Sequence, residues 1–163
     1  MKPVLRPALA VAALALAATA TAVAPATAAA APQHTTATQG KYCTYIVDTG
    51  QGGCFDTRAQ AARFGGTRAD YKVLGKMWTD ANSGGRELAL RGSVGCGWRY
   101  PEFNALSKWD FNDNISSVEG VTCPITLWEH ADFRGAKQTY HGYVPYIGDA
   151  MNDKASSVSF DLR

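Results

Sequence analysis

The chain has 163 residues and carries 16 Lys and Arg side chains against 14 Asp and Glu side chains, so it is close to neutral. The basic residues form no dense cluster. This argues against nucleic acid and against an anionic membrane as the main partner.

Residues 1–30 are predicted to be a secretion signal. Lys2 and Arg6 precede an Ala, Leu and Val run over residues 7–24, and Ala26-Thr27-Ala28 offers a cleavage site between small residues. An uncleaved membrane anchor is the alternative, but the run is short, rich in alanine and broken by threonines, and no other segment is long and apolar enough to span a bilayer. We therefore expect a secreted, extracellular protein. Its mature form would begin between residues 29 and 32 and, without Lys2 and Arg6, would have a formal net charge of zero.

The four cysteines predict two disulfides, because the chain is directed to an oxidising compartment. A polar lead-in over residues 31–40, which we expect to be disordered, precedes the first of them. Cys43 and Cys54 bracket a glycine-rich turn, as the two strands of a hairpin would. Among the three possible pairings, this spacing favours Cys43 with Cys54 and Cys96 with Cys123.

A short helix is expected over residues 57–64, with Asp56 or Thr57 as its N-cap and Gly65-Gly66 as its stop. The disulfide hairpin and this helix make up one predicted segment, residues 41–69. From residue 70 to residue 163 the pattern changes to short apolar segments separated by turn residues, without a sustained helical period. This second segment is predicted to be all-β.

The second segment contains an internal repeat, with one unit over residues 74–121 and the other over residues 125–162. A glycine follows the opening tryptophan by seven residues in both units, as Trp78 to Gly85 and as Trp128 to Gly135. The first unit carries about ten extra residues before its closing loop, and this insertion includes Cys96.

Each unit closes with the same oxygen-rich string, residues 112–117 (NDNISS) and residues 152–157 (NDKASS), followed by an apolar strand. Asn, Asp and Ser are ordinary turn residues, so one copy alone would be a weak signal. Calcium needs about six to eight oxygen ligands, and each string offers carboxylate or amide side chains, backbone carbonyls and a hydroxyl within one turn. Two copies at the same point of a repeated unit predict paired calcium sites.

The two units resemble the Greek-key motif of the microbial βγ-crystallins. The resemblance rests on the spacing aromatic-x-x-x-x-Phe-x-Gly in residues 128–135, followed by Asn-Asp-x-x-Ser-Ser, and the first unit matches with Ser83 in place of the second aromatic. It covers roughly residues 72–163. It implies an all-β domain in which two four-stranded Greek keys form one βγ-crystallin-like sandwich, preceded by the disulfide-closed hairpin. Gly85 and Gly135 would take a backbone conformation that is costly for a residue with a Cβ.

The resemblance also implies where calcium would bind. The family's sites combine each closing loop with a backbone carbonyl beside the opening aromatic, for which Thr79 and Glu129 are the matching positions. Which hairpin serves which loop stays open. Ser117 and Ser157 are expected to bond the hairpin backbone instead. The implied loop ligands are the side chains of Asn112, Asp113, Ser116, Asn152, Asp153 and Ser156 and the backbone carbonyls of Asn114 and Lys154.

The sequence favours a secreted calcium-binding protein, stabilised by two Ca²⁺ ions, over an enzyme. The three histidines, His34, His130 and His141, belong to no His-Glu-x-x-His motif, and no Gly-x-Ser-x-Gly string occurs. We expect a monomer with calcium ions as its partners.

A second class of function stays open, namely a secreted proteinase inhibitor or a killer-toxin-like protein on the same fold. Bacterial metalloproteinase inhibitors are similar in size, in having two disulfides and in a Cys-Pro shortly before a Trp-Glu key, as in Cys123-Pro124 here. The insertion over residues 93–107 would then enter the cleft of a secreted protease, whereas otherwise it is a connection tethered by a disulfide.

Overall fold

The computed structural model describes residues 40–66, 71–96 and 102–160. The predicted signal peptide and all of the lead-in except Gly40 lie outside these residues. Within the described ranges, no helix has the length and apolar character needed to cross a membrane.

The chain first forms a hairpin of β1 (Tyr42–Ile46) and β2 (Gln51–Phe55). The two strands are antiparallel, and Cys43 lies opposite Cys54, with which it forms a disulfide. This confirms the hairpin that the glycine-rich turn predicted. The second disulfide joins Cys96 to Cys123.

Helix α1 (Arg58–Arg63) follows, one residue shorter at each end than the predicted range 57–64, with Thr57 as its N-cap. The Thr57 hydroxyl accepts a hydrogen bond from the Gln60 backbone N–H at 3.3 Å, and the Gln60 side chain accepts one from the Thr57 N–H at 3.1 Å. This reciprocal capping box satisfies donors that the first helical turn leaves unpaired. Gly65 and Gly66, with φ of 88° and 78°, take the chain out of the helix.

Two Greek keys account for the rest of the described chain. The first contains β3 (Lys72–Asp80), β4 (Gly84–Gly92), β5 (Glu102–Phe103) and β6 (Ser117–Gly120), and the second contains β7 (Ile125–His130), β8 (Arg134–Tyr140), β9 (Tyr143–Val144) and β10 (Ser157–Ser159). Short 3₁₀ turns cover Ala81–Ser83 and Leu106–Trp109.

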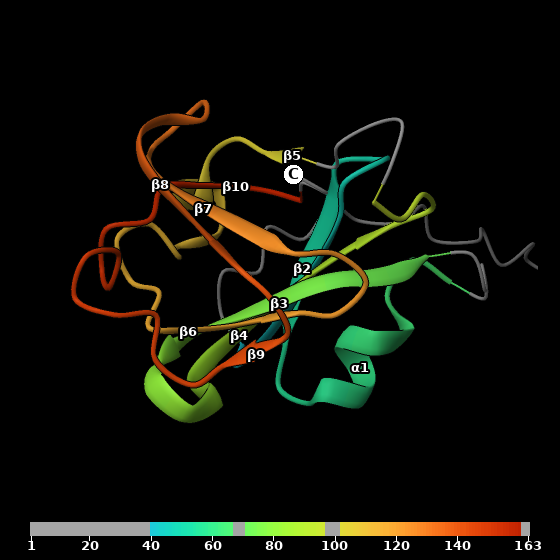
Figure 1. Ribbon diagram of the computed structural model, residues 1–163. Helices are drawn as coiled ribbons and strands as arrows, with labels where there is room; N and C mark the ends of the chain where they lie inside the picture. The colour runs from blue at the N-terminus through green and yellow to red at the C-terminus, as the bar shows by residue number, and fades with distance from the viewer. Residues whose placement is uncertain (1–39, 67–70, 97–101, 161–163) are drawn as a thin grey trace, which may run out of the picture. The chain divides into compact units, whose positions relative to one another are not determined.

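The keys exchange their third strands. One sheet has six strands in the order β2-β1-β4-β3-β6-β9, and the other has four in the order β5-β10-β7-β8. Strand β9 of the second key therefore completes the sheet of the first, and β5 of the first key completes the sheet of the second (Figure 1). A single cluster of buried side chains, including Leu88, Phe103, Ile115 and Leu127, joins the two sheets. The predicted all-β sandwich of two Greek keys is confirmed.

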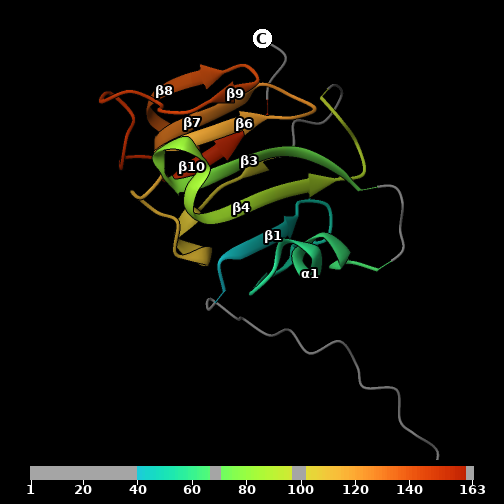
Figure 2. The ribbon, with the colours of Figure 1, turned by 90° about the horizontal axis from the view of Figure 1, so that it is seen from below.

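The disulfide hairpin is part of this fold, a point that the sequence left open. Strand β1 pairs in parallel with β4 over five positions, from Tyr42 opposite Glu87 to Ile46 opposite Arg91. Helix α1 lies beside β1 (Figure 2) and contacts both strands of the hairpin. The segment before the keys thus widens one sheet of the sandwich and covers part of its outer face.

Both keys fold their first hairpin in the same way. Asn82, Ser83 and Gly85 have positive φ, and so do Asp132, Phe133 and Gly135 at the corresponding positions of the second key. A Cβ on Gly85 would lie 2.0 Å from the Thr79 hydroxyl oxygen. The expectation that these two glycines take a conformation costly to other residues is confirmed.

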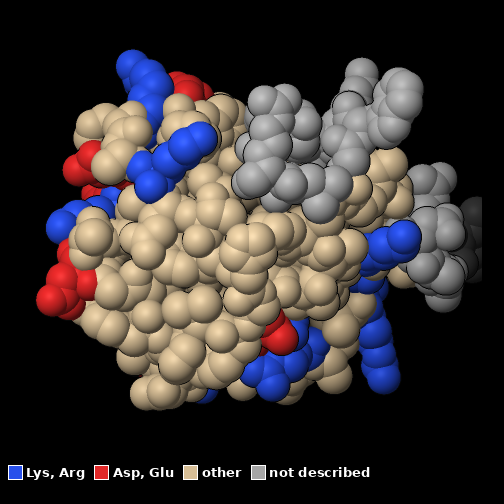
Figure 3. Space-filling model, in the orientation of Figure 1, with Lys and Arg blue, Asp and Glu red and all other residues tan. Residues whose placement is uncertain are grey.

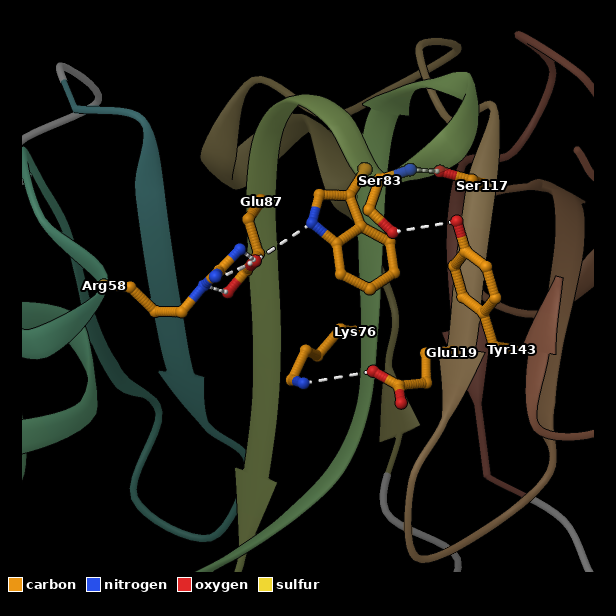
Figure 4. Close-up of polar contacts among 8 residues, drawn as sticks. Arg58, Lys76, Ser83, Glu87, Ser117, Glu119 and Tyr143 are labelled. Carbon is orange, nitrogen blue, oxygen red and sulfur yellow. Dashed lines mark hydrogen bonds and ion pairs between the residues drawn. The ribbon is translucent and has the colours of Figure 1, made fainter. Parts of the chain in front are cut away.

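Ser83 was the one departure from the motif, and the structure supplies an aromatic side chain from elsewhere. In the second key, the rings of Trp128 and Phe133 form an edge contact with centroids 6.3 Å apart. In the first key, Tyr143 of β9 makes the same contact with Trp78, also at 6.3 Å. The Ser83 hydroxyl donates to the Tyr143 hydroxyl oxygen at 3.1 Å (Figure 4).

The insertion of the first key, residues 93–107, is only partly described, because residues 97–101 lie outside the described ranges. Its last part belongs to the fold. Phe103 of β5 is 2% exposed, and Leu106 is fully buried. Residues 102–107 therefore do not form a free loop.

Candidate functional site

The two closing loops, residues 112–117 and 152–157, lie against each other and are joined by reciprocal backbone hydrogen bonds. The Asp113 N–H donates to the Ala155 carbonyl at 2.9 Å, and the Asp153 N–H donates to the Ile115 carbonyl at 3.1 Å. Asp113 and Asp153 both have a left-handed backbone, with φ of 52° and 54°. The sequence repeat is therefore a structural repeat, in which each aspartate faces the loop of the other key.

Each loop also contacts the hairpin of its own key. The Ser116 N–H donates to the Trp78 carbonyl at 3.0 Å, and the Ser156 N–H donates to the Trp128 carbonyl at 2.8 Å. The next residues, Thr79 and Glu129, lie where the strand pairing skips a position. The backbone at Thr79 is thus close to Ser116, and the backbone at Glu129 is close to Ser156.

The side chains of Thr79 and Glu129 are engaged within their hairpins. The Thr79 hydroxyl accepts from the Arg86 N–H at 2.9 Å, and the Glu129 carboxylate accepts from the Ala136 N–H at 3.1 Å. The backbone carbonyls of these positions are further oxygens that they can offer to an ion. The resemblance implied the same contribution.

In both loops the asparagine holds the aspartate that follows it. The Asn112 amide donates to Asp113 Oδ2 at 2.6 Å, and the Asn152 amide donates to Asp153 Oδ2 at 2.7 Å. The other carboxylate oxygen of Asp113, Oδ1, lies 3.3 Å from the Ser156 hydroxyl oxygen of the opposite loop. The structure therefore brings together an aspartate of one key and a serine of the other.

These groups surround an open depression of about 360 Å³, lined by Asp113, Glu129, His130, Asp153, Lys154 and Ser156. His130 was not among the predicted site residues, and its only sequence signal is its place directly after Glu129. The Lys154 ammonium bonds the carbonyls of Asp149 and Ala150 at 3.0 and 3.4 Å. This cation is tied to the preceding turn, so Lys154 can contribute its backbone carbonyl.

The last serine of each loop has a structural role, as the sequence suggested. Ser117 donates to the Asp80 carbonyl at 2.7 Å and accepts from the Ser83 N–H at 3.1 Å (Figure 4). Ser157 likewise donates to the His130 carbonyl at 2.6 Å and accepts from the Phe133 N–H at 3.1 Å. These two hydroxyls fix the loops to the folded hairpins and are not available to an ion.

The donor set suits a hard cation. Two oxygens that are each about 2.4 Å from a calcium ion and at roughly right angles lie about 3.4 Å apart, close to the separation of Asp113 Oδ1 and Ser156 Oγ. Asn152 Oδ1 is a buried oxygen without a hydrogen-bond partner. Over the described part of the chain, no three His, Cys, Asp or Glu side chains cluster as metal ligands. Carboxylate, hydroxyl and backbone carbonyl oxygens are ligands that calcium takes in proteins, whereas structural zinc sites use mainly Cys and His.

Charged side chains on one face of the molecule are mixed in sign (Figure 3). On the face shown in Figure 3, acidic and basic side chains lie next to one another, and no extended patch of one charge is visible among the residues that the structure describes. This face has no single-sign field that would steer a polyanion to it.

Comparison with known proteins finds matches among solved structures, whereas no protein-family model and no curated protein matches the chain. A βγ-crystallin domain from Clostridium beijerinckii is 26% identical, with a TM-score of 0.42, and the match covers 55% of this chain and 98% of that chain. A βγ-crystallin domain from Flavobacterium johnsoniae is 21% identical, with a TM-score of 0.42, and the match covers 55% and 96%. A βγ-crystallin from Ciona intestinalis is 21% identical, with a TM-score of 0.44, and the match covers 53% and 98%.

Proposed function

We propose that this chain, which has a βγ-crystallin-type fold, is a secreted protein that binds two calcium ions and is stabilised by them. The observation that carries the proposal is the reciprocal crossing of the two closing loops. It sets the Asp113 carboxylate beside the Ser156 hydroxyl of the other key. If the repeated residues served only to form turns, nothing would require a side-chain oxygen of one loop to lie beside a side-chain oxygen of the other.

We base a proposed ligand set for each ion on these contacts. The first site would use the side chains of Asp113 and Ser156 with the backbone carbonyl of Glu129. Because the two keys repeat the same arrangement, the second site would use the matching groups, namely the side chains of Asp153 and Ser116 and the backbone carbonyl of Thr79. Asn112 and Asn152 orient the carboxylates. Backbone carbonyls at Asn114 and Lys154 are the further oxygens that the resemblance offers.

An ion in either site would bridge the two keys, because each site takes side chains from both. Ions that bind only the folded state stabilise it by mass action, by about 2.7 kcal/mol per independent site at a hundredfold excess over the dissociation constant. Such linkage would suit a small domain in an extracellular medium that contains calcium, where the predicted signal sequence would direct the chain. The proposal includes no catalytic role.

The inhibitor alternative has no specific support. Residues 102–107 of the insertion belong to the sandwich, with β5 paired to β10. Residues 97–101 lie outside the described ranges, so the tip of the insertion carries no argument. We therefore do not propose protease inhibition.

Calcium titration of the mature, oxidised protein by calorimetry tests the proposal. The expected result is two binding events, together with a melting temperature that is lower in chelator, by about 10 °C for each site at a hundredfold excess of calcium over the dissociation constant. Asp113→Ala and Asp153→Ala should each remove one event, whereas Asp149→Asn, which removes a nearby charge outside the ligand set, should keep both. No binding at millimolar calcium would show that the loops are turn chemistry alone.

A further inference from the structure

A second cavity lies away from the calcium loops, between α1 and the outer face of the six-stranded sheet. Its volume is about 200 Å³, and its walls come from α1, β1, β3 and β4. Nothing in the Greek-key motif accounts for it, because α1 and β1 belong to the segment that precedes the keys. The cavity is therefore a product of this additional segment.

Charged contacts fix the helix over the cavity at both ends. Near the start of α1, the Arg58 guanidinium bonds the buried carboxylate of Glu87 on β4, with the closest contact at 2.7 Å (Figure 4). At the other end, the Arg91 guanidinium of β4 donates to the carbonyls of Ala62 and Phe64, both at 3.1 Å. The helix is thus tied to β4 from both sides, which keeps the space beneath it open.

Two side chains that line this cavity each carry a buried polar atom without a hydrogen-bond partner. These atoms are the hydroxyl oxygen of Thr44 and Nε of Arg91. Thr44 is 1% exposed. It lies opposite Ala89 on β4, two residues before Arg91, so both side chains are on the same face of the sheet. Buried donors without partners are costly, and these two point to an acceptor that enters the cavity.

The cavity has a surplus of positive charge. Among the residues that the structure describes, Arg58, Lys76 and Arg91 line it with one acid, Glu87. The Glu87 carboxylate is already occupied, because it accepts from Arg58 and, at 2.9 Å, from the Trp78 indole N–H. Lys76 pairs at 3.0 Å with Glu119 outside the cavity wall (Figure 4). An anion would therefore find unsatisfied donors and a net positive environment.

Between these polar groups the wall is apolar, formed by Ala61, Ala62, Val73 and Ala89. An apolar cavity of about 150 Å³ is large enough for benzene, so a cavity of this size can hold a ring or a short alkyl chain. Small, uncharged side chains cannot fill the space themselves. The lining thus suits a molecule with one acidic end and one apolar end.

We propose that this cavity is a binding site for a small organic monocarboxylate with a ring-sized or short aliphatic body. Because both donor atoms are closed off from the cavity as it stands, binding requires the Thr44 and Arg91 side chains to turn towards it. The carboxylate then accepts hydrogen bonds from the Thr44 hydroxyl and from Arg91 Nε, and the apolar end packs against the alanines of α1 and β4. The proposal is independent of calcium binding, since the two sites share no residue.

Benzoate and hexanoate are suitable probes, followed by NMR of the oxidised protein in metal-free buffer and again with calcium. Saturable shifts should appear at Thr44 and at the Arg91 Nε–H resonance in both buffers. Thr44→Val keeps the shape of the side chain and removes the donor, so it should weaken benzoate binding roughly tenfold, the effect expected for one hydrogen bond to a charged group. Ala89→Leu should fill the cavity and abolish binding.

The matched control is Thr126→Val, which replaces a buried threonine in the other sheet and should leave benzoate affinity unchanged. Benzyl alcohol has a similar shape without the charge and should bind at least tenfold more weakly. The proposal is overturned if neither acid gives saturable shifts, if benzyl alcohol binds as well as benzoate, or if a folded Ala89→Leu variant still binds. Each of these results leaves the calcium titration unaffected.

Discussion

The exchange of ligands between the two closing loops can be tested with paired substitutions. If Asp113 and Ser156 hold the same ion, the variant Asp113→Ala/Ser156→Ala damages one site and leaves the other intact. The same-loop variant Asp113→Ala/Ser116→Ala instead damages both sites. The two variants carry the same kinds of substitution, so each serves as the composition control for the other.

The size of the effect follows from linkage. At a hundredfold excess of calcium over the dissociation constant, each intact site contributes about 2.7 kcal/mol to the free energy of unfolding. For a domain of this size, 1 kcal/mol corresponds to about 3–5 °C in melting temperature, so each site is worth about 10 °C. The cross-loop variant, Asp113→Ala/Ser156→Ala, should keep the stabilisation by one calcium ion. The same-loop variant, Asp113→Ala/Ser116→Ala, should keep little of the stabilisation by either ion.

The assay is a thermal melt of each variant in calcium and in chelator, with calorimetry to count binding events. The difference between the two melts is the quantity to compare, because intrinsic destabilisation cancels in it. This matters because Asp113 has φ of 52°, where alanine adds strain of about 1 kcal/mol to both forms. If the same-loop variant keeps one site of full affinity and the cross-loop variant keeps none, the ligands are not exchanged.

Three further predictions concern stability. Gly85→Ala should lower the free energy of unfolding by at least about 2 kcal/mol in urea denaturation, because the new Cβ meets the Thr79 hydroxyl at 2.0 Å as well as an unfavourable φ. Gly142 has φ of 63°, but a Cβ added there would meet no atom within 4 Å, so Gly142→Ala should cost only the strain of the backbone conformation. If the two variants lose the same free energy of unfolding, the steric argument for Gly85 is refuted. Burial raises the pKa of Tyr140 to about 12. Since the neutral phenol is favoured in the folded state, stability should be complete below about pH 10 and should fall by up to about 1.4 kcal/mol per pH unit as the pH rises towards 12, a slope that Tyr140→Phe should reduce. Tyr143→Ala should cost about 1 kcal/mol or more through the lost ring contact with Trp78, whereas Tyr146→Ala, with no such contact, should cost less in the same denaturation experiment.

The parts of the fold that depend on neighbouring residues could be predicted from the sequence. Thr57 and Gln60 form the capping box within one turn, and the spacing from Trp128 to Gly135 specifies one folded hairpin. The repeated strings placed both closing loops correctly at the ends of their keys. In each case the determining contacts lie within a few residues of one another.

The parts that sequence reasoning missed depend on contacts between distant residues. The parallel pairing of β1 with β4 joins Tyr42 to Glu87, and no local pattern marks two such strands as neighbours. Tyr143 replaces the aromatic ring missing at Ser83 from sixty residues away. Which hairpin lies beside which loop was left open for the same reason, because the contacts that decide it, Ser116 with Trp78 and Ser156 with Trp128, join residues that are far apart in the sequence.

The exchange of β5 and β9 means that neither half of the repeat is an autonomous folding unit. The first key alone would leave the edge of β6 open where β9 belongs, and the second alone would leave β10 open where β5 belongs. Unpaired edges of this kind recruit strands from other chains. The same strand could then be donated between two molecules instead of within one, so the topology that closes the monomer also contains a route to a domain-swapped dimer.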